Sequence, residues 1–132
     1  MKSLLFPNPR REVGSIAEIS EYIGTDFPEI AGKTPAICAV IASGGGVFCG
    51  EVRYTDGSTF RACPINRDIS GMYGGVLLSV QSISGTDVKL FRLENRLYAT
   101  FFRHGLSCCY YSSNTEDETS ALTAVLNIII SL

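Results

Sequence analysis

The sequence lacks several residues on which strong site chemistry commonly depends. It has no Trp, a single histidine (His104), and no CxxC pair among its five cysteines. A structural zinc site needs four ligands, mostly Cys and His, so we expect no metal cofactor. The apolar runs are short: residues 36–42 fall well below the roughly 20 residues that span a bilayer, and residues 1–6 are too few for a signal-peptide core. We expect no transmembrane segment and a protein that stays in the compartment where it is made.

Charge is scarce as well, since Asp, Glu, Lys and Arg together make up 18% of the chain. The formal net charge is −2, so no overall electrostatic field would gather nucleic acid, and we expect no nucleic-acid partner. In contrast, 45% of the 132 residues are hydrophobic, which is ample for one well-filled core. With no internal repeat and no shift in composition, the sequence predicts a single domain over residues 1–132.

The cysteines are odd in number, and most of them lie in apolar, strand-like stretches. This usage is typical of free thiols that fill a core in a reducing compartment, so we expect free thiols at all five positions. These positions are Cys38, Cys49, Cys63, Cys108 and Cys109.

The two ends of the chain have different patterns. Residues 1–13 contain two prolines and no periodicity, which predicts a flexible N-terminal arm. Ser15 followed by Glu18 has capping-box spacing, and the isoleucines behind it indicate a helix that ends near Gly24. At the other end, polar residues 114–119 precede a second helix, whose apolar face we expect at Leu122, Val125, Leu126 and Ile129.

The residues between these helices have strand patterns. The run 36–42 is apolar at every position, which predicts a strand buried on both faces at the centre of a sheet. The Gly-rich link 43–46 and the pair Asp56-Gly57 predict hairpin turns to strands over 47–54 and 58–63. Residues 64–75 predict a loop with one helical turn near 68–72, and four strands follow over 75–83, 87–93, 96–103 and 106–113. The fold class is therefore α/β of the α+β type, with a central antiparallel sheet of six or seven strands and both helices packed on one face.

Three segments resemble catalytic motifs but have simpler interpretations. The glycines of 43–46 precede a strand, whereas a phosphate-binding loop requires a helix at that point. Cys108 and Cys109 are neighbours on a strand and face opposite sides, so at most one could approach His104. The acids at 116–118 are typical of a helix cap. We therefore predict no catalytic residue and a protein that is not an enzyme.

Basic residues on consecutive strands of the second half are interleaved with aromatic residues. Cross-strand neighbours could gather them into one basic-aromatic patch, a composition that protein interfaces favour. Ordinary solvated strand positions are the alternative. The basic members are Lys89, Arg92, Arg96 and Arg103, and the aromatic members are Phe91, Tyr98, Phe101 and Phe102.

In two segments the sequence resembles a strongly divergent profilin. Residues 35–50 are similar to the profilin stretch in which an Ala-rich strand meets a Gly-containing turn and an aromatic residue, and residues 101–132 are similar to the profilin ending. The resemblance implies a cytoplasmic, cytoskeleton-associated monomer that binds monomeric actin, and also phosphoinositides and proline-rich segments. The actin face of that family corresponds here to Lys89, Arg92, Arg96, Tyr98, Arg103, Asn114 and Glu116.

The same resemblance places a proline-rich ligand on an aromatic platform between the terminal helices. Because this chain has no Trp, only Tyr22 and Phe27 remain as candidates for that platform. An alternative family of similar layout is the roadblock or longin module, a dimerisation or GTPase-docking scaffold. That module has a substantial helix between its second and third strands, and it usually pairs, so oligomeric state distinguishes the two.

Overall fold

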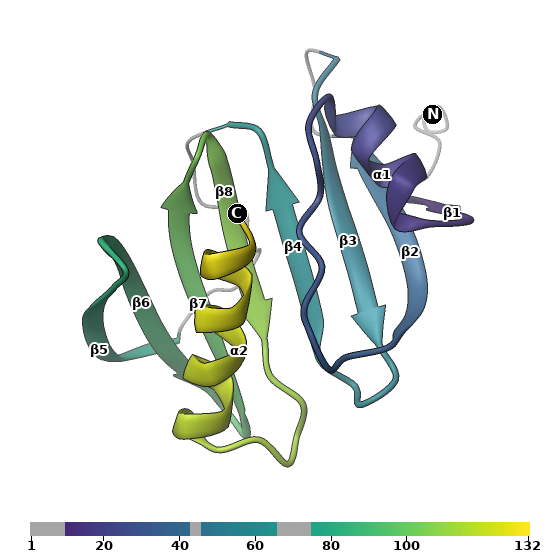
Figure 1. The fold of residues 1–132 in the computed structure, drawn as a ribbon. Helices are drawn as coiled ribbons and strands as arrows, with labels where there is room; N and C mark the ends of the chain where they lie inside the picture. Colours follow the sequence, from purple (N-terminus) through teal and green to yellow (C-terminus); the bar gives the residue numbers. More distant parts are fainter. Residues whose placement is uncertain (1–9, 43–45, 66–74) are drawn as a thin grey trace, which may run out of the picture.

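A computed structural model describes residues 10–42, 46–65 and 75–132 and arranges them as one antiparallel sheet with a helix near each end of the chain (Figure 1). The spatial order of the strands is β1-β2-β3-β4-β8-β7-β6-β5. Their bounds are β1 Arg10–Val13, β2 Pro35–Ala42, β3 Phe48–Tyr54, β4 Thr59–Cys63, β5 Val76–Ile83, β6 Thr86–Leu93, β7 Arg96–Arg103 and β8 Leu106–Tyr111. The sheet is open, with β1 and β5 at its two edges.

The two helices form where the capping residues predict them. Helix α1 spans Ile16–Ile23, its Ser15 cap accepts a hydrogen bond from the Glu18 amide, and Gly24 ends it in the left-handed conformation. Helix α2 spans Glu118–Ser131, and the side chain of its cap, Asp117, accepts from the Ser120 amide. Both helices contribute to one hydrophobic core, so the prediction that they pack on one face of the sheet is confirmed (Figure 1).

The face of α2 that meets the sheet is rotated from the expected one. Its buried residues are Ala121, Ala124, Val125, Ile128 and Ile129, whereas Leu126 is 38% exposed. The small alanines let the helix approach the sheet closely, and this turns Leu126 toward solvent. The expected apolar face was therefore wrong at Leu126.

The strand expected at the centre of the sheet lies near one edge instead. β2 is second from the edge, between β1 and β3, and only Ala39 and Val40 of its eight residues are buried. The strand that is buried at all six positions is β8, which lies between β4 and β7. An apolar run thus predicted a strand correctly but gave the wrong position, because position depends on the long-range pairing of β4 with β8.

The sheet has eight strands rather than six or seven because part of the predicted arm joins it. Arg10–Val13 pairs antiparallel with β2, and Val13 lies opposite Cys38. These four residues are therefore not a flexible arm, since the ladder with β2 supplies the backbone hydrogen bonds that a free arm lacks. The helical turn expected near residues 68–72 lies outside the described residues.

Two cysteines expected as free thiols form a disulfide bond. Cys49 of β3 and Cys63 of β4 are joined, with their Cα atoms 4.2 Å apart. The cause is the register of the hairpin: Gly50 lies opposite Ala62, so the next position brings the two cysteines face to face. Cys108 and Cys109 face opposite sides of the sheet, as predicted, because Cys108 belongs to the main core and Cys109 to a second cluster.

β4 and β5 follow each other along the chain but are separated in the sheet by three other strands, so the described ends of their connection lie far apart in the strand order. The carbonyl of Ile65 accepts a hydrogen bond from the Ser107 hydroxyl, and Gly75 packs against the Tyr98 ring. Ser107 and Tyr98 both lie on the face opposite the helices. The described ends of this connection therefore lie over that face, which we call the open face.

Candidate functional site

A row of large apolar side chains crosses the open face from the β5 edge to the middle of the sheet. The register places Leu77 opposite Phe91, Phe91 opposite Tyr98, and Tyr98 opposite Tyr111. Phe91 stacks on Tyr98 with ring centroids 4.8 Å apart, and the Tyr98 and Tyr111 centroids are 6.4 Å apart. Together with Cys109 and Leu93 these rings form a small cluster separate from the main core. A continuous row of three aromatic rings therefore lies on the open face.

One end of this row opens into a pocket of about 390 Å³, which we call the Tyr98 pocket. The rings of Tyr98 and Tyr111 lie at its base, and both residues are less than 10% exposed. Its rim is polar and exposed, at Glu94, Asn95 and Asn114. The complete lining is Leu93, Glu94, Asn95, Arg96, Leu97, Tyr98, Tyr111 and Asn114. A pocket with an apolar floor and a polar rim suits a side chain of a partner better than a charged small molecule.

Arg96 holds the walls of this pocket in place. Its Nε and Nη2 donate to the carbonyl of Ser112 at 3.2 and 2.9 Å, and Nη2 also donates to the carbonyl of Gly57 at 3.0 Å. One guanidinium thereby joins the start of β7 to the segment before α2 and to the β3–β4 turn. Arg96 is thus anchored to backbone, so its charge is already directed inward.

The Tyr111 hydroxyl on the floor does not titrate near neutral pH. Burial raises the pKa of Tyr111 well above its usual range, although the Arg61 guanidinium, 5.5 Å from the ring centroid, opposes the shift. Tyr98 is covered by Gly75, where an added Cβ would lie 2.4 Å from the Tyr98 hydroxyl oxygen. Both rings of the floor are therefore closely packed, and the Tyr111 hydroxyl stays protonated.

The structure brings together three of the seven residues that the resemblance assigns to an actin face. Arg96, Tyr98 and Asn114 all line the Tyr98 pocket, although they come from two distant segments. Lys89 and Arg92 are exposed, but they are three positions apart on β6 and therefore lie on opposite faces of the sheet. Arg92 lies opposite Leu97, a residue of the main core, whereas Lys89 lies on the open face. The basic residues therefore do not form one continuous patch.

The two remaining members of that set make internal contacts. Arg103 donates from Nη1 to the Ser84 carbonyl at 3.0 Å and to the Thr86 hydroxyl at 2.7 Å, which fixes the β5–β6 turn. Glu116 accepts from the Tyr110 hydroxyl at 2.7 Å and from the Ser113 amide at 2.8 Å. The polar groups of both side chains are therefore engaged in hydrogen bonds that hold loops of the fold in place.

The two aromatic residues expected to bind a proline-rich segment are separated. Tyr22 is 38% exposed and packs edge-on against Phe48 with centroids 5.2 Å apart. Phe27 is only 4% exposed and packs against Phe60. A cavity of about 610 Å³ does lie between α1 and the end of α2, and Phe27 lines it whereas Tyr22 does not. The two rings therefore form no shared platform.

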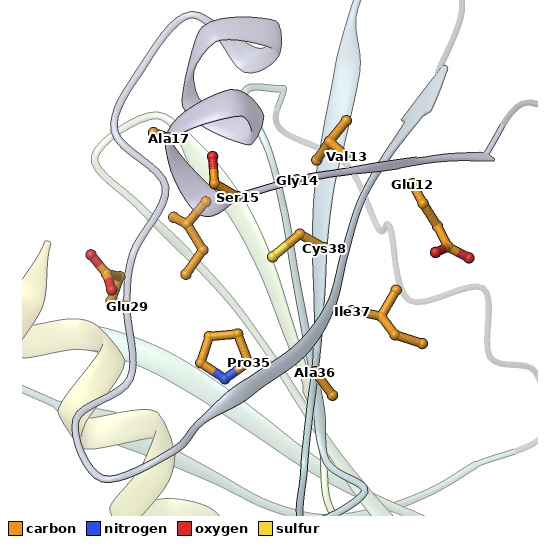
Figure 2. A pocket seen from close by; sticks show the side chains of 11 residues that line it. Glu12, Val13, Gly14, Ser15, Ala17, Glu29, Pro35, Ala36, Ile37 and Cys38 are labelled. Carbon is orange, nitrogen blue, oxygen red and sulfur yellow. The ribbon is translucent and has the colours of Figure 1, made fainter.

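A further cavity, of about 470 Å³, lies between the start of α1 and β2. Figure 2 shows Cys38 pointing into it between Ser15 and Pro35, whereas Glu12 and Ile37 point away. Burial, aided by the negative charge of Glu18, raises the pKa of the Cys38 thiol. A raised pKa lowers the fraction of Cys38 that is present as the nucleophilic thiolate at neutral pH.

Sequence reasoning missed the most buried charge of the described structure. Glu51 is 2% exposed and lies on the open face of β3, where it accepts hydrogen bonds from Arg61 Nη2 at 2.6 Å and Arg10 Nε at 3.1 Å. Desolvation alone would raise the pKa of Glu51, but the two guanidinium groups outweigh it and lower the pKa. A glutamate in the middle of an apolar strand was the available signal. Its partners on β1 and β4 could be found only from the strand order.

Comparisons with known proteins give no relative. No protein-family model, no curated protein and no solved structure matches the chain. Within residues 10–42, 46–65 and 75–132, no group of three or more His, Cys, Asp and Glu side chains could hold a metal ion. None of the helices described is long and apolar enough to cross a membrane.

Proposed function

We propose that this chain is a non-catalytic protein-binding domain, and that the Tyr98 pocket receives a side chain of its partner. The observation that carries this proposal is the convergence of Arg96, Tyr98 and Asn114, from segments separated along the chain, on one pocket with an aromatic floor. Aromatic residues in well-packed pockets supply most of the energy at protein interfaces. The partner's side chain would displace water from the floor while its backbone meets the exposed rim.

Monomeric actin is the partner that we propose for this pocket. The three residues named above are among those that correspond to the actin face of profilin, the family that the sequence resembles. Lys89, exposed on the open face of β6, would add a positive charge that attracts an acidic region of the partner and mainly raises the association rate. The role is stoichiometric: one domain occupies one actin monomer and shifts filament assembly by mass action, without covalent chemistry.

A titration of the purified full chain against fluorescently labelled monomeric actin tests the proposal. The informative variant is Asn114→Trp, because Asn114 is exposed on the rim and a bulky ring there fills the pocket without touching the core. Its matched control is Thr123→Trp, an exposed position on α2 that does not line the pocket. We expect saturable binding that Asn114→Trp weakens about tenfold or more and Thr123→Trp leaves unchanged.

The possible outcomes distinguish a wrong binding surface from a wrong partner. Binding that both variants leave intact would place the interface elsewhere on the domain. No binding at concentrations of tens of micromolar, on the order of a −6 kcal/mol limit, would remove actin as the partner. The roadblock or longin interpretation, a dimerisation or GTPase-docking scaffold, would then be the better proposal, and oligomeric state would be its first test.

A further inference from the structure

The edge strand β5 has almost none of the features that normally protect a sheet edge. Its eight residues, VLLSVQSI, include no charge and no proline, and β6 is its neighbour in the described sheet. Proteins usually blunt such an edge with charges, prolines or a short strand. The one device present is a bulge between Leu77 and Ser79. The exposed apolar members are Val76 at 63%, Leu77 at 51%, Leu78 at 36% and Val80 at 54%.

The opposite edge of the same sheet shows the contrast. β1 is only four residues long, and three of them, Arg10, Arg11 and Glu12, are charged. A short, charged strand accepts another strand poorly. One edge of this sheet is therefore closed to strand addition, and the other is open to it.

From this contrast we propose that β5 pairs with the β5 strand of a second copy of this chain. The pairing is antiparallel about a two-fold axis and joins the two sheets into one continuous sheet. Because β5 carries no charge, a second β5 strand meets no like-charge repulsion, and a two-fold antiparallel pair centred on the exposed apolar residues sets that apolar stretch against itself. Since the charged β1 edge does not accept a β5 strand, the assembly closes as a dimer and does not grow into a fibre.

The size of the contact sets the expected strength. Four apolar side chains exposed to this degree present on the order of a few hundred Å² per copy, which is at the small end for specific interfaces. We therefore expect a dissociation constant in the micromolar range, so that the dimer is seen only at higher concentrations. This result would differ from the monomer that the profilin resemblance implies.

Sedimentation of the full-length chain over about 1 to 200 µM tests the dimer. The variant is Val80→Lys, because Val80 is exposed and lies opposite Lys89, away from the Tyr98 pocket. The control is Ile130→Lys, since Ile130 on α2 is 63% exposed and equally apolar. We expect concentration-dependent dimers of the parent chain and of Ile130→Lys, and a dissociation constant raised about tenfold or more by Val80→Lys. Circular dichroism checks that each variant is folded.

Three outcomes would overturn this inference. A parent chain that stays monomeric throughout the range has no β5 pairing. A dimer that Ile130→Lys dissolves and Val80→Lys does not is formed through α2. Growth beyond a dimer shows an interface that does not close. Because sedimentation of the chain alone measures the dimer and the titration with Asn114→Trp measures actin binding, failure of the dimer and failure of actin binding are told apart directly.

Discussion

Gly50 determines how closely α1 can lie against the sheet. It sits in β3 directly below the helix, and a Cβ placed on it would lie 2.3 Å from Ile19 Cγ2 and 2.6 Å from Phe27 Cε2. Carbon atoms in normal contact are about 3.5 to 4.0 Å apart, so both neighbours would have to move by about 1 Å or more. Neither can do so easily, because Ile19 is fully buried and Phe27 also packs against Phe60.

We therefore expect Gly50→Ala to destabilise the fold. Overpacking of a well-filled core costs about 1 to 3 kcal/mol, and two fixed neighbours place this site at the upper end. Alanine offsets part of the loss, about 0.5 to 1 kcal/mol, because it restricts the unfolded chain more than glycine does. The net expectation is a loss of about 2 kcal/mol, or roughly 5 to 10 °C in melting temperature for a domain of this size.

Urea unfolding followed by circular dichroism measures this loss. The double variant Gly50→Ala with Ile19→Ala is the internal control, because removing the Ile19 side chain removes the first clash. Its cost should be smaller than the sum of the two single costs. If Gly50→Ala is as stable as the parent chain, or more stable, the close packing of α1 on β3 is wrong.

Four further predictions concern polar side chains. The Tyr54 hydroxyl is buried without a hydrogen-bond partner among the residues that the structure describes, so Tyr54→Phe should be neutral or stabilising by about 1 kcal/mol. Tyr110→Phe removes a 2.7 Å hydrogen bond to the Glu116 carboxylate and should cost about 1 kcal/mol or more. Urea unfolding of each variant measures both changes in stability. Glu51→Gln removes the negative charge that faces the guanidinium groups of Arg10 and Arg61 and should cost about 2 to 3 kcal/mol. Arg53→Gln should cost less than about 1 kcal/mol, because the Arg53 side chain is 52% exposed. Desolvation would raise the pKa of Asp56, but the hydrogen bonds of its carboxylate outweigh desolvation and lower the pKa to about 2. The contribution of Asp56 to stability is therefore complete above about pH 5 and is lost as the pH falls toward 2. Over that window, acid titration of Asp56→Asn should show a smaller loss of stability than titration of the parent chain.

The elements of this fold could be predicted from sequence because their boundaries are marked locally. Ser15 and Gly24 bracket α1 through contacts within a few residues, and Gly57 has the positive φ of +91° that its turn requires. His104-Gly105 likewise ends β7 and starts β8, with φ of 51° and 78°. Signals of this kind depend on neighbours along the chain, so one sequence is enough to find them.

The order of the strands could not be predicted in this way. Whether β2 or β8 is central depends on β4 pairing with β8, and residues such as Phe60 and Tyr110 that meet there are far apart in sequence. The Cys49–Cys63 bond lies within a predicted hairpin, but the turn sequence does not fix which residues of its two strands lie opposite each other, and only the observed register brings these cysteines, 14 positions apart, face to face. Long-range pairing leaves no local mark on either strand.

The candidate site was predictable only in part. The turn at Glu94 and Asn95 and the aromatic residues beside it indicated a possible surface, and Tyr98 does lie in the pocket there. The sequence could not reveal that Arg96 donates hydrogen bonds to the carbonyls of Ser112 and Gly57. For that reason a charge reversal at Arg96 would disturb the fold along with any interface, and Asn114 is the better position to test.

The measurement that tests the central proposal most directly is hydrogen exchange, followed by mass spectrometry, on the full chain with and without monomeric actin. If the Tyr98 pocket is the binding surface, peptides covering residues 93–98 and 111–115 should exchange more slowly in the mixture, whereas those of α1 should be unchanged. Protection confined to α1 and β2, or no protection anywhere under saturating actin, would contradict the proposal.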